Sequence, residues 1–176
     1  KVEVVDNGSD FAGNIPVEQL RRSARDKLRL PSDEFMFLFV GQHIWEKNLE
    51  FLLEALAEIR TLPFRMYFIG SGYAASELRR KTEDLYLTDK VIFMGSITER
   101  ERLKLYYAAA DLFLFPSLYD NAPLVVREAA ALHTPSLLIK GSTSAEVIHD
   151  SVNGFLSDNS VTAYASRISQ LLETPQ

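Results

Sequence analysis

The stretch LFLFPSLYDNAPLVVREAAA (residues 112–131) contains, in order, an apolar run, a polar loop and a second segment rich in small apolar residues. A run as short as LFLFP (112–116), bounded by turn residues, is typical of a buried strand. Proline is favoured in the first turn of a helix, so we expect a helix over about 123–132 with Pro123 as its first residue. The stretch therefore predicts one strand–loop–helix unit.

The same unit recurs along most of the chain. Strands are expected at 35–41, 65–70, 91–95, 112–116, 136–140 and 154–157, and helices at about 48–60, 74–86, 99–109, 123–132, 143–149 and 160–173. This alternation predicts an α/β fold: a doubly wound, Rossmann-like parallel sheet of about six strands with helices on both faces. Ligands of such sheets bind beyond the carboxyl ends of the strands, so candidate residues are sought in the loops that follow them.

A further helix is expected at about 17–29, where Val17, Leu20, Ala24 and Leu28 form one apolar stripe. Five basic residues occupy its other faces, and a solvated face is favoured over a membrane-surface role for them. The residues before this helix are rich in turn formers. We therefore divide the chain into a linker over 1–16 and one domain over 17–176.

Composition narrows the function further. The chain has 176 residues, enough for one domain with a full core, and its net charge of −5 argues against a nucleic-acid partner. It contains no cysteine, which fits a reducing compartment, so a cytoplasmic location is expected. No apolar run approaches the roughly 20 residues that span a bilayer. The chain begins with lysine rather than methionine, so we expect it to be a piece of a larger protein.

Two carboxylates stand out around the helix of the opening stretch. Glu128 lies in a helix that is apolar except for itself and Arg127, and an ionised carboxylate on a packed face is costly unless something binds it. Asp120 lies before the helix, and seven residues separate it from Glu128. A ligand at the helix N-terminus would therefore meet both carboxylates and the backbone between them. The structural alternative makes Asp120 or Asn121 a helix cap and Glu128 a buried ion-pair partner.

Several other chemistries find little support. His43, His133 and His149 lack a metal-ligand spacing, and no Asp-x-Asp motif is present, so no metal site is expected. The sequence also lacks a Gly-x-Ser-x-Gly elbow and a Walker phosphate loop. A dinucleotide-dependent oxidoreductase is disfavoured because GQHIWEKN (41–48), rather than a Gly-x-Gly-x-x-Gly turn, follows the first clear strand. Glu146 fits a capping box with Thr143, which favours a structural role for it.

Five blocks together resemble one known family. They are FVGQHIWEKNLEFLLEAL (39–56), MYFIGSGYAASELRR (66–80), VIFMGSITERERLKLYYAAADLFLFPS (91–117), FPSLYDNAPLVVREAAALHTPSLL (115–138) and AEVIHDSVNGFL (145–156). In this order they are similar to the retaining GT-B glycosyltransferases of family 4, also called glycosyl transferases group 1. The resemblance implies the C-terminal, nucleotide-sugar-binding half of such an enzyme. The N-terminal half, which carries the acceptor site, is expected to be absent from this chain.

The resemblance also implies roles for particular residues. Glu128 would hold the ribose hydroxyls of the donor nucleotide, and Asp120, where the family usually has glutamate, would face the transferred sugar. Lys47 would bind the diphosphate and stabilise the departing nucleotide. The arginine that the family places after Gly41 is replaced by Gln42, which supplies no charge, and His43 is a neighbour that could substitute for it. Further expected donor-binding residues are Gly41, Gln42, Gly72, Ile97, Asn121, Ala122, Pro123 and Leu124.

The sequence thus predicts the donor domain of a retaining, metal-independent glycosyltransferase. A UDP-sugar is the expected co-substrate, no cofactor is expected, and the partner is the acceptor domain of the same enzyme, which as a whole could associate peripherally with a membrane. Gly70 and Gly72 fit a ligand-approaching turn and an ordinary tight turn equally well. The alternative function is a non-catalytic nucleotide-sugar-binding or interaction domain, because Gln42 and the short Asp120 depart from the family pattern. The base, the sugar and the acceptor are not identified by the sequence.

Overall fold

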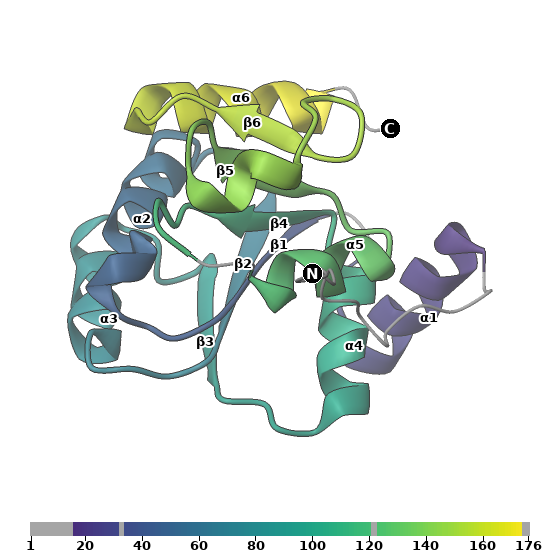
Figure 1. The fold of residues 1–176 in the computed structure, drawn as a ribbon. Helices are drawn as coiled ribbons and strands as arrows, with labels where there is room; N and C mark the ends of the chain where they lie inside the picture. Colours follow the sequence, from purple (N-terminus) through teal and green to yellow (C-terminus); the bar gives the residue numbers. More distant parts are fainter. Residues whose placement is uncertain (1–15, 32–33, 121–122, 174–176) are drawn as a thin grey trace, which may run out of the picture.

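The computed structural model describes residues 16–31, 34–120 and 123–173 (Figure 1). The expected linker over 1–16 therefore lies, apart from Pro16, outside the described residues, as do Asn121 and Ala122. Six strands form one sheet in the order β3-β2-β1-β4-β5-β6, and every neighbouring pair is parallel. The predicted doubly wound α/β fold is confirmed.

The central strands are apolar on both faces because helices cover both sides of the sheet. Strand β1 reads FMFLFV, and Phe37, Leu38 and Phe39 within it are fully buried. Its neighbours β2 and β4 pair with it in register at Phe37↔Met66 and Phe37↔Leu112. The strands are β1 (Phe35–Val40), β2 (Phe64–Ile69), β3 (Val91–Gly95), β4 (Leu112–Phe115), β5 (Ser136–Ile139) and β6 (Phe155–Ser157).

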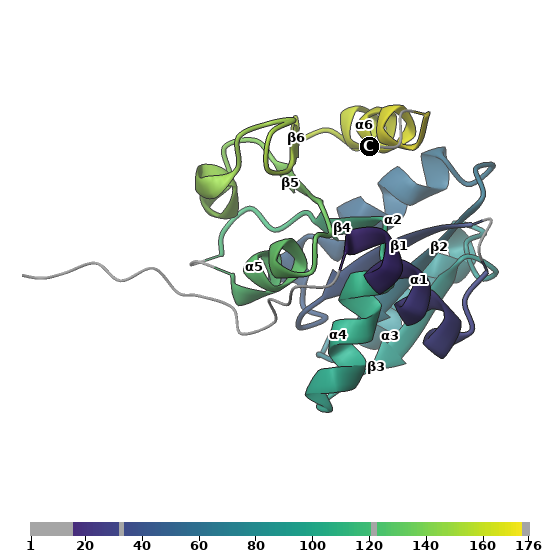
Figure 2. The same ribbon diagram turned by 90° about the vertical axis from the view of Figure 1, so that its right-hand side faces the viewer.

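The helices divide into two groups on opposite sides of the sheet (Figure 1). Helix α2 packs against α3 and α6, whereas α4 packs against α1 and α5, and Figure 2 shows α1 beside α4. Within the described residues no helix combines the length and apolar character needed to cross a bilayer. The helices are α1 (Val17–Leu28), α2 (Leu49–Glu58), α3 (Ala75–Asp84), α4 (Arg100–Ala109), α5 (Leu124–Ala131) and α6 (Val161–Glu173), with 3₁₀ turns η1 (Trp45–Lys47) and η2 (Thr143–Val147).

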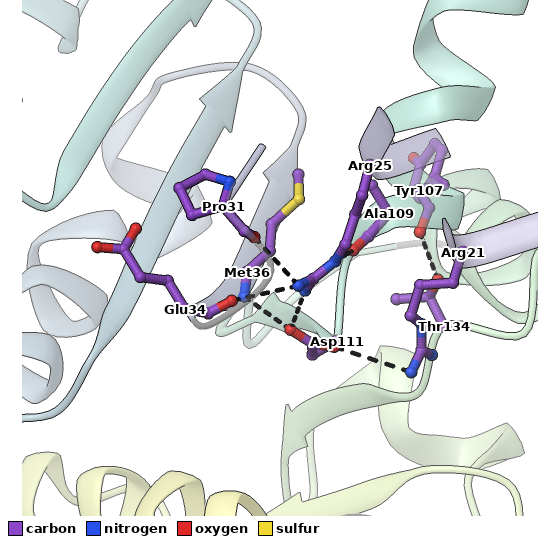
Figure 3. Close-up of polar contacts among 9 residues, drawn as sticks. All are labelled: Arg21, Arg25, Pro31, Glu34, Met36, Tyr107, Ala109, Asp111 and Thr134. Carbon is purple, nitrogen blue, oxygen red and sulfur yellow. Dashed lines mark hydrogen bonds and ion pairs between the residues drawn. The ribbon is translucent and has the colours of Figure 1, made fainter. Parts of the chain in front are cut away.

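Helix α1 differs from its prediction on its basic side. The Arg25 guanidinium donates to the carbonyl of Ala109 at 3.1 Å and to Asp111 Oδ2 at 2.5 Å, and the Met36 N–H donates to the same Asp111 oxygen at 2.8 Å (Figure 3). Arg21 lies 3.8 Å from the other Asp111 oxygen. The expectation of a wholly solvated basic face is wrong for Arg25, because this side chain attaches α1 to the segment that begins β4.

Two element starts also differ from prediction. Helix α5 begins at Leu124, and Pro123 is its N-cap with an extended ψ of 117° rather than its first helical residue. The segment expected as a helix over 143–149 is a 3₁₀ turn, and Ser142 rather than Thr143 is its N-cap, with no side-chain capping bond. The predicted Thr143–Glu146 capping box is therefore wrong. The Thr143 hydroxyl is engaged elsewhere, as described below.

Candidate functional site

The strand order determines which loops meet at the carboxyl edge of the sheet. Because β1, β4 and β5 are neighbours, the loops that follow them lie side by side there. These are the segments at 41–48, 116–120 and 140–147, and each contains residues singled out in the sequence. The candidate site is therefore assembled by sheet topology from segments far apart in the chain.

Lys47 and Asp120 meet at this edge. Lys47 ends the 3₁₀ turn η1, and its ammonium group donates to Asp120 Oδ2, with both side chains less than one-fifth exposed. The following residue, Asn48, adopts the left-handed conformation with φ 57°, and its side-chain amide donates to the carbonyl of Pro116 at 3.2 Å. The sequence placed Lys47 and Asp120 in one site, and the structure joins them directly.

Thr143 holds the loop that carries Asp120. The Asp120 N–H donates to Thr143 Oγ1 at 2.7 Å, and the same hydroxyl donates to the Asp120 carbonyl at 2.9 Å. The Thr143 N–H also donates to the carbonyl of Leu118 at 3.1 Å. Thr143, in the loop that follows β5, thus satisfies backbone groups of the loop that follows β4. Glu146, three residues further on, is exposed.

Glu128 obtains a partner from helix α4. The Tyr107 hydroxyl donates to Glu128 Oε2 at 2.9 Å, and the Tyr107 side chain is fully buried. Burial, followed by the nearby Glu128 charge, raises the pKa of the Tyr107 phenol far above its usual value, so the phenol stays protonated as a donor. Glu128 is itself half-buried, and Leu124, one turn earlier on the same stripe of α5, is 52% exposed. The expectation of a fully packed face around Glu128 is therefore wrong at its N-terminal end.

His43 does not replace the missing arginine. Its side chain is 2% exposed and lies among Phe39, Phe68 and Phe93, with ring centroids 5.9–6.3 Å away. Burial, followed by the charge of Arg79, lowers the pKa of His43 below its ordinary 6.5, so the ring is neutral at pH 7. The expectation that His43 could supply the charge absent from Gln42 is wrong, because an apolar aromatic environment disfavours the imidazolium.

Two loops pack so closely at Gly70 and Gly72 that neither position has room for a side chain. A Cβ at Gly72 would lie 2.3 Å from the His43 carbonyl oxygen, and at Gly70 one would lie 1.9 Å from the Gly41 carbonyl oxygen. The backbone of His43 is bonded in both directions, donating to Ser71 O at 2.9 Å and accepting from the Ala74 N–H at 3.0 Å. Close packing of the 41–44 and 70–74 segments therefore explains these glycines, which favours the structural interpretation.

The remaining expected donor-binding residues are spread along this edge. Gln42 and Leu124 are exposed, whereas Gly41, Ile97 and Pro123 are half-buried. His133 and His149 are exposed, and the described residues contain no group of three or more His, Asp or Glu side chains that could hold a metal ion. Sequence reasoning missed Thr143 and Tyr107 as site partners, because the bonds they make depend on which strands are neighbours.

The fold and the position of these polar side chains define a Rossmann-like doubly wound domain whose polar loops gather at the carboxyl edge. The chain belongs to the family Glycosyl transferases group 1, whose model matches residues 21–176. The resemblance to group 1 glycosyltransferases is thereby confirmed.

Known proteins show the same relationship. An uncharacterised glycosyltransferase of Methanocaldococcus jannaschii is 31% identical over 158 residues, which cover 88% of this chain and 40% of that protein. Sucrose-phosphate synthase from Thermosynechococcus elongatus matches with a TM-score of 0.81 at 28% identity, over 97% of this chain and 42% of that chain. Anabaena HepE, solved with UDP and glucose, has the same fold, with a TM-score of 0.80 at 23% identity over 97% of this chain and 47% of that chain. The chain thus spans less than half the length of each.

Proposed function

We propose that this chain is the donor-binding domain of a retaining, metal-independent glycosyltransferase. The donor is a nucleoside diphosphate sugar, with UDP-sugar as the first candidate because HepE was solved with UDP. The acceptor is held by a second domain, which is consistent with relatives more than twice as long as this chain. The observation that carries the proposal is the Lys47–Asp120 pair, built by neighbouring loops at the carboxyl edge of the sheet.

The proposed chemistry assigns one task to each of the three charged residues. In the transfer step, the bond between the anomeric carbon and the donor phosphate oxygen breaks, the acceptor oxygen bonds to that carbon on the same face, and the acceptor hydroxyl proton passes to the released phosphate. The nucleoside diphosphate leaves with increased negative charge, which the Lys47 ammonium stabilises in place of a metal ion. Asp120 binds a hydroxyl of the transferred sugar, and Glu128 accepts hydrogen bonds from the ribose hydroxyls.

Tyr107 supports this assignment of Glu128. The phenol donates to Oε2 and so orients the carboxylate, which retains acceptor capacity for two ribose hydroxyls. A carboxylate has about four lone-pair sites, and one phenol occupies one of them. The half-buried position of Glu128 lets a ligand reach it and strengthens the hydrogen bonds that form.

Calorimetric titration with UDP, GDP and ADP, with EDTA present, tests the proposal. We expect one nucleotide to bind, and we expect Glu128→Gln to lower its affinity by about tenfold, because hydrogen bonds to a charged acceptor contribute about 1.5–3 kcal/mol. Glu83→Gln, an exposed carboxylate of α3, is the matched control and should leave the affinity unchanged. The proposal is wrong if the folded chain binds none of the three nucleotides. It is also wrong if Glu128→Gln binds the nucleotide as tightly as the wild type does.

A further inference from the structure

Asp120 is held by the backbone as well as by its carboxylate. The Thr143 hydroxyl accepts from the Asp120 N–H at 2.7 Å and donates to the Asp120 carbonyl at 2.9 Å, so one side chain satisfies both backbone polar groups of one residue. We call this pair of bonds the Thr143 clasp. The Thr143 N–H extends it by donating to the Leu118 carbonyl at 3.1 Å.

We infer that Thr143 is a positioning residue, which sets the place of the Asp120 carboxylate beside Lys47 and thereby the recognition of the donor sugar. The inference rests on the function proposed above and deepens it. Thr143 need not touch the donor in this role, because it acts through the backbone of Asp120.

The length of the side chain makes the backbone position important. Aspartate has one methylene fewer than glutamate, so its carboxylate has less reach and follows the main chain more closely. The Lys47 ammonium donates to that carboxylate from the loop after β1, while the clasp holds the same residue from the loop after β5. Asp120 is therefore held from both sides, between its two neighbouring loops.

The chemistry of the clasp selects the residue type at position 143. A hydroxyl is both a donor and an acceptor, so serine can reproduce the two bonds, whereas the isosteric valine can make neither. Thr143 is exposed, so water can take over the freed backbone groups in the valine variant. We therefore expect the fold to survive the change and the position of Asp120 to be lost.

The first experiment measures sugar recognition directly. Titrations of the chain with UDP and with UDP-glucose, UDP-galactose and UDP-N-acetylglucosamine give the wild-type preference for its best sugar nucleotide over UDP. We expect Thr143→Val to reduce that preference about fivefold or more while the UDP affinity changes less than about twofold, since one hydrogen bond to a charged group is being misplaced. Thr143→Ser should restore the preference, and Thr162→Val, an exposed threonine of α6, should not alter it.

Two further measurements separate positioning from a general structural role. Amide exchange of Asp120, followed by NMR, should accelerate in Thr143→Val and remain slow in Thr143→Ser. In an Asp120→Ala background, Thr143→Val should cause no additional loss of sugar preference, because the residue through which it acts is gone. If Thr143→Val does not fold, Thr143→Ala provides the same comparison with a smaller side chain.

These experiments distinguish a failure of the Thr143 positioning role from a failure of the proposed donor-binding function. A folded chain that binds UDP but keeps its sugar preference in Thr143→Val, or loses UDP and sugar nucleotide affinity equally, overturns the positioning role alone. The positioning role is also overturned if Thr143→Val lowers the sugar preference as much in the Asp120→Ala background as in the wild type. A wild-type chain that binds no nucleotide overturns the proposed function and this inference with it.

Discussion

Strand β4 has an ion-paired aspartate near each end, and the two pairs differ in what surrounds them. Asp111 directly precedes the strand and binds Arg25, whereas Asp120 lies five residues beyond it and binds Lys47. The two pairs are buried to similar degrees, with side-chain exposures of 14% and 23% in the first and 19% and 18% in the second. Burial therefore does not distinguish them.

Hydrogen bonding does distinguish them. Asp111 Oδ2 also accepts the Met36 N–H, and Arg25 also donates to the carbonyls of Ala109 and Glu34. The Lys47 ammonium has three donors, and within the described residues its hydrogen-bond acceptor is Asp120. The first pair is saturated by the chain itself and holds structure together. The second has donor capacity left for a ligand, which is what a binding site requires.

The largest expected effect is on stability, at the saturated pair. Arg25→Ala removes the guanidinium that donates to Asp111 and to the carbonyls of Ala109, Pro31 and Glu34, so we expect the free energy of unfolding to fall by about 2–3 kcal/mol. Urea unfolding of the variant measures this change. Arg22→Ala, an exposed neighbour on α1, is the control and should change it by less than about 0.5 kcal/mol. Equal losses in the two variants would mean that Arg25 stabilises the fold no more than an exposed arginine does.

The second effect falls on binding, at the unsaturated pair. Lys47→Met removes the proposed diphosphate contact, so UDP affinity should fall about tenfold or more, because charge-assisted hydrogen bonds contribute about 1.5–3 kcal/mol. The free energy of unfolding should change by less than about 1 kcal/mol, as for other single ion pairs near the surface. Calorimetry and urea unfolding of one preparation measure both quantities. A large loss of stability with unchanged UDP affinity would make this pair structural too.

A smaller effect of opposite sign is expected from the partner of Lys47. Asp120→Asn removes the negative charge that competes with a phosphate for the ammonium, so UDP without a sugar should bind about twofold to threefold more tightly at low salt. Titration at two ionic strengths checks this, because the gain should shrink as salt screens the charges. Asp111→Asn should lower stability instead and leave UDP affinity unchanged. Tighter binding in both variants would indicate only the loss of general negative charge.

The smallest effect concerns the neutral neighbour of the site. His43 has a folded-state pKa below its ordinary 6.5, so the unfolded chain binds this proton more readily. Stability from this group is complete above pH 6.5 and is lost as the pH falls from there toward the folded-state pKa. We expect His43→Phe to flatten the pH dependence of unfolding between about pH 7 and 5, by at most about 1.4 kcal/mol per pH unit. His133→Gln, at an exposed position, is the control for the loss of a histidine. An unchanged slope in His43→Phe would mean that the imidazole titrates freely.

The sequence predicted the sheet well because buried parallel strands leave a simple mark. A short apolar run such as FMFLFV is enough to identify a buried strand in the sequence. The observed strand bounds differ from the predicted ones by about one residue. The bonds of Arg25, Thr143 and Tyr107 were not predicted, because each joins residues at least 21 positions apart through the order of strands or the packing of helices. Lys47 and Asp120 were assigned to one site only through the family pattern, since neither residue type signals the other along the chain.

The close approach of Gly72 to the His43 carbonyl has a consequence for evolvability. Main-chain hydrogen bonds join His43 to Ser71 and Ala74. His43 lies two positions before the 3₁₀ turn that ends in Lys47. These bonds use backbone atoms only, so they persist with any residue type that keeps its N–H group, and Gln42 beside them is exposed. The chain can therefore exchange the residue at position 42 without rebuilding the support of Lys47. Charge at this edge of the sheet is adjustable by single mutations, while the backbone that presents it is held by main-chain hydrogen bonds.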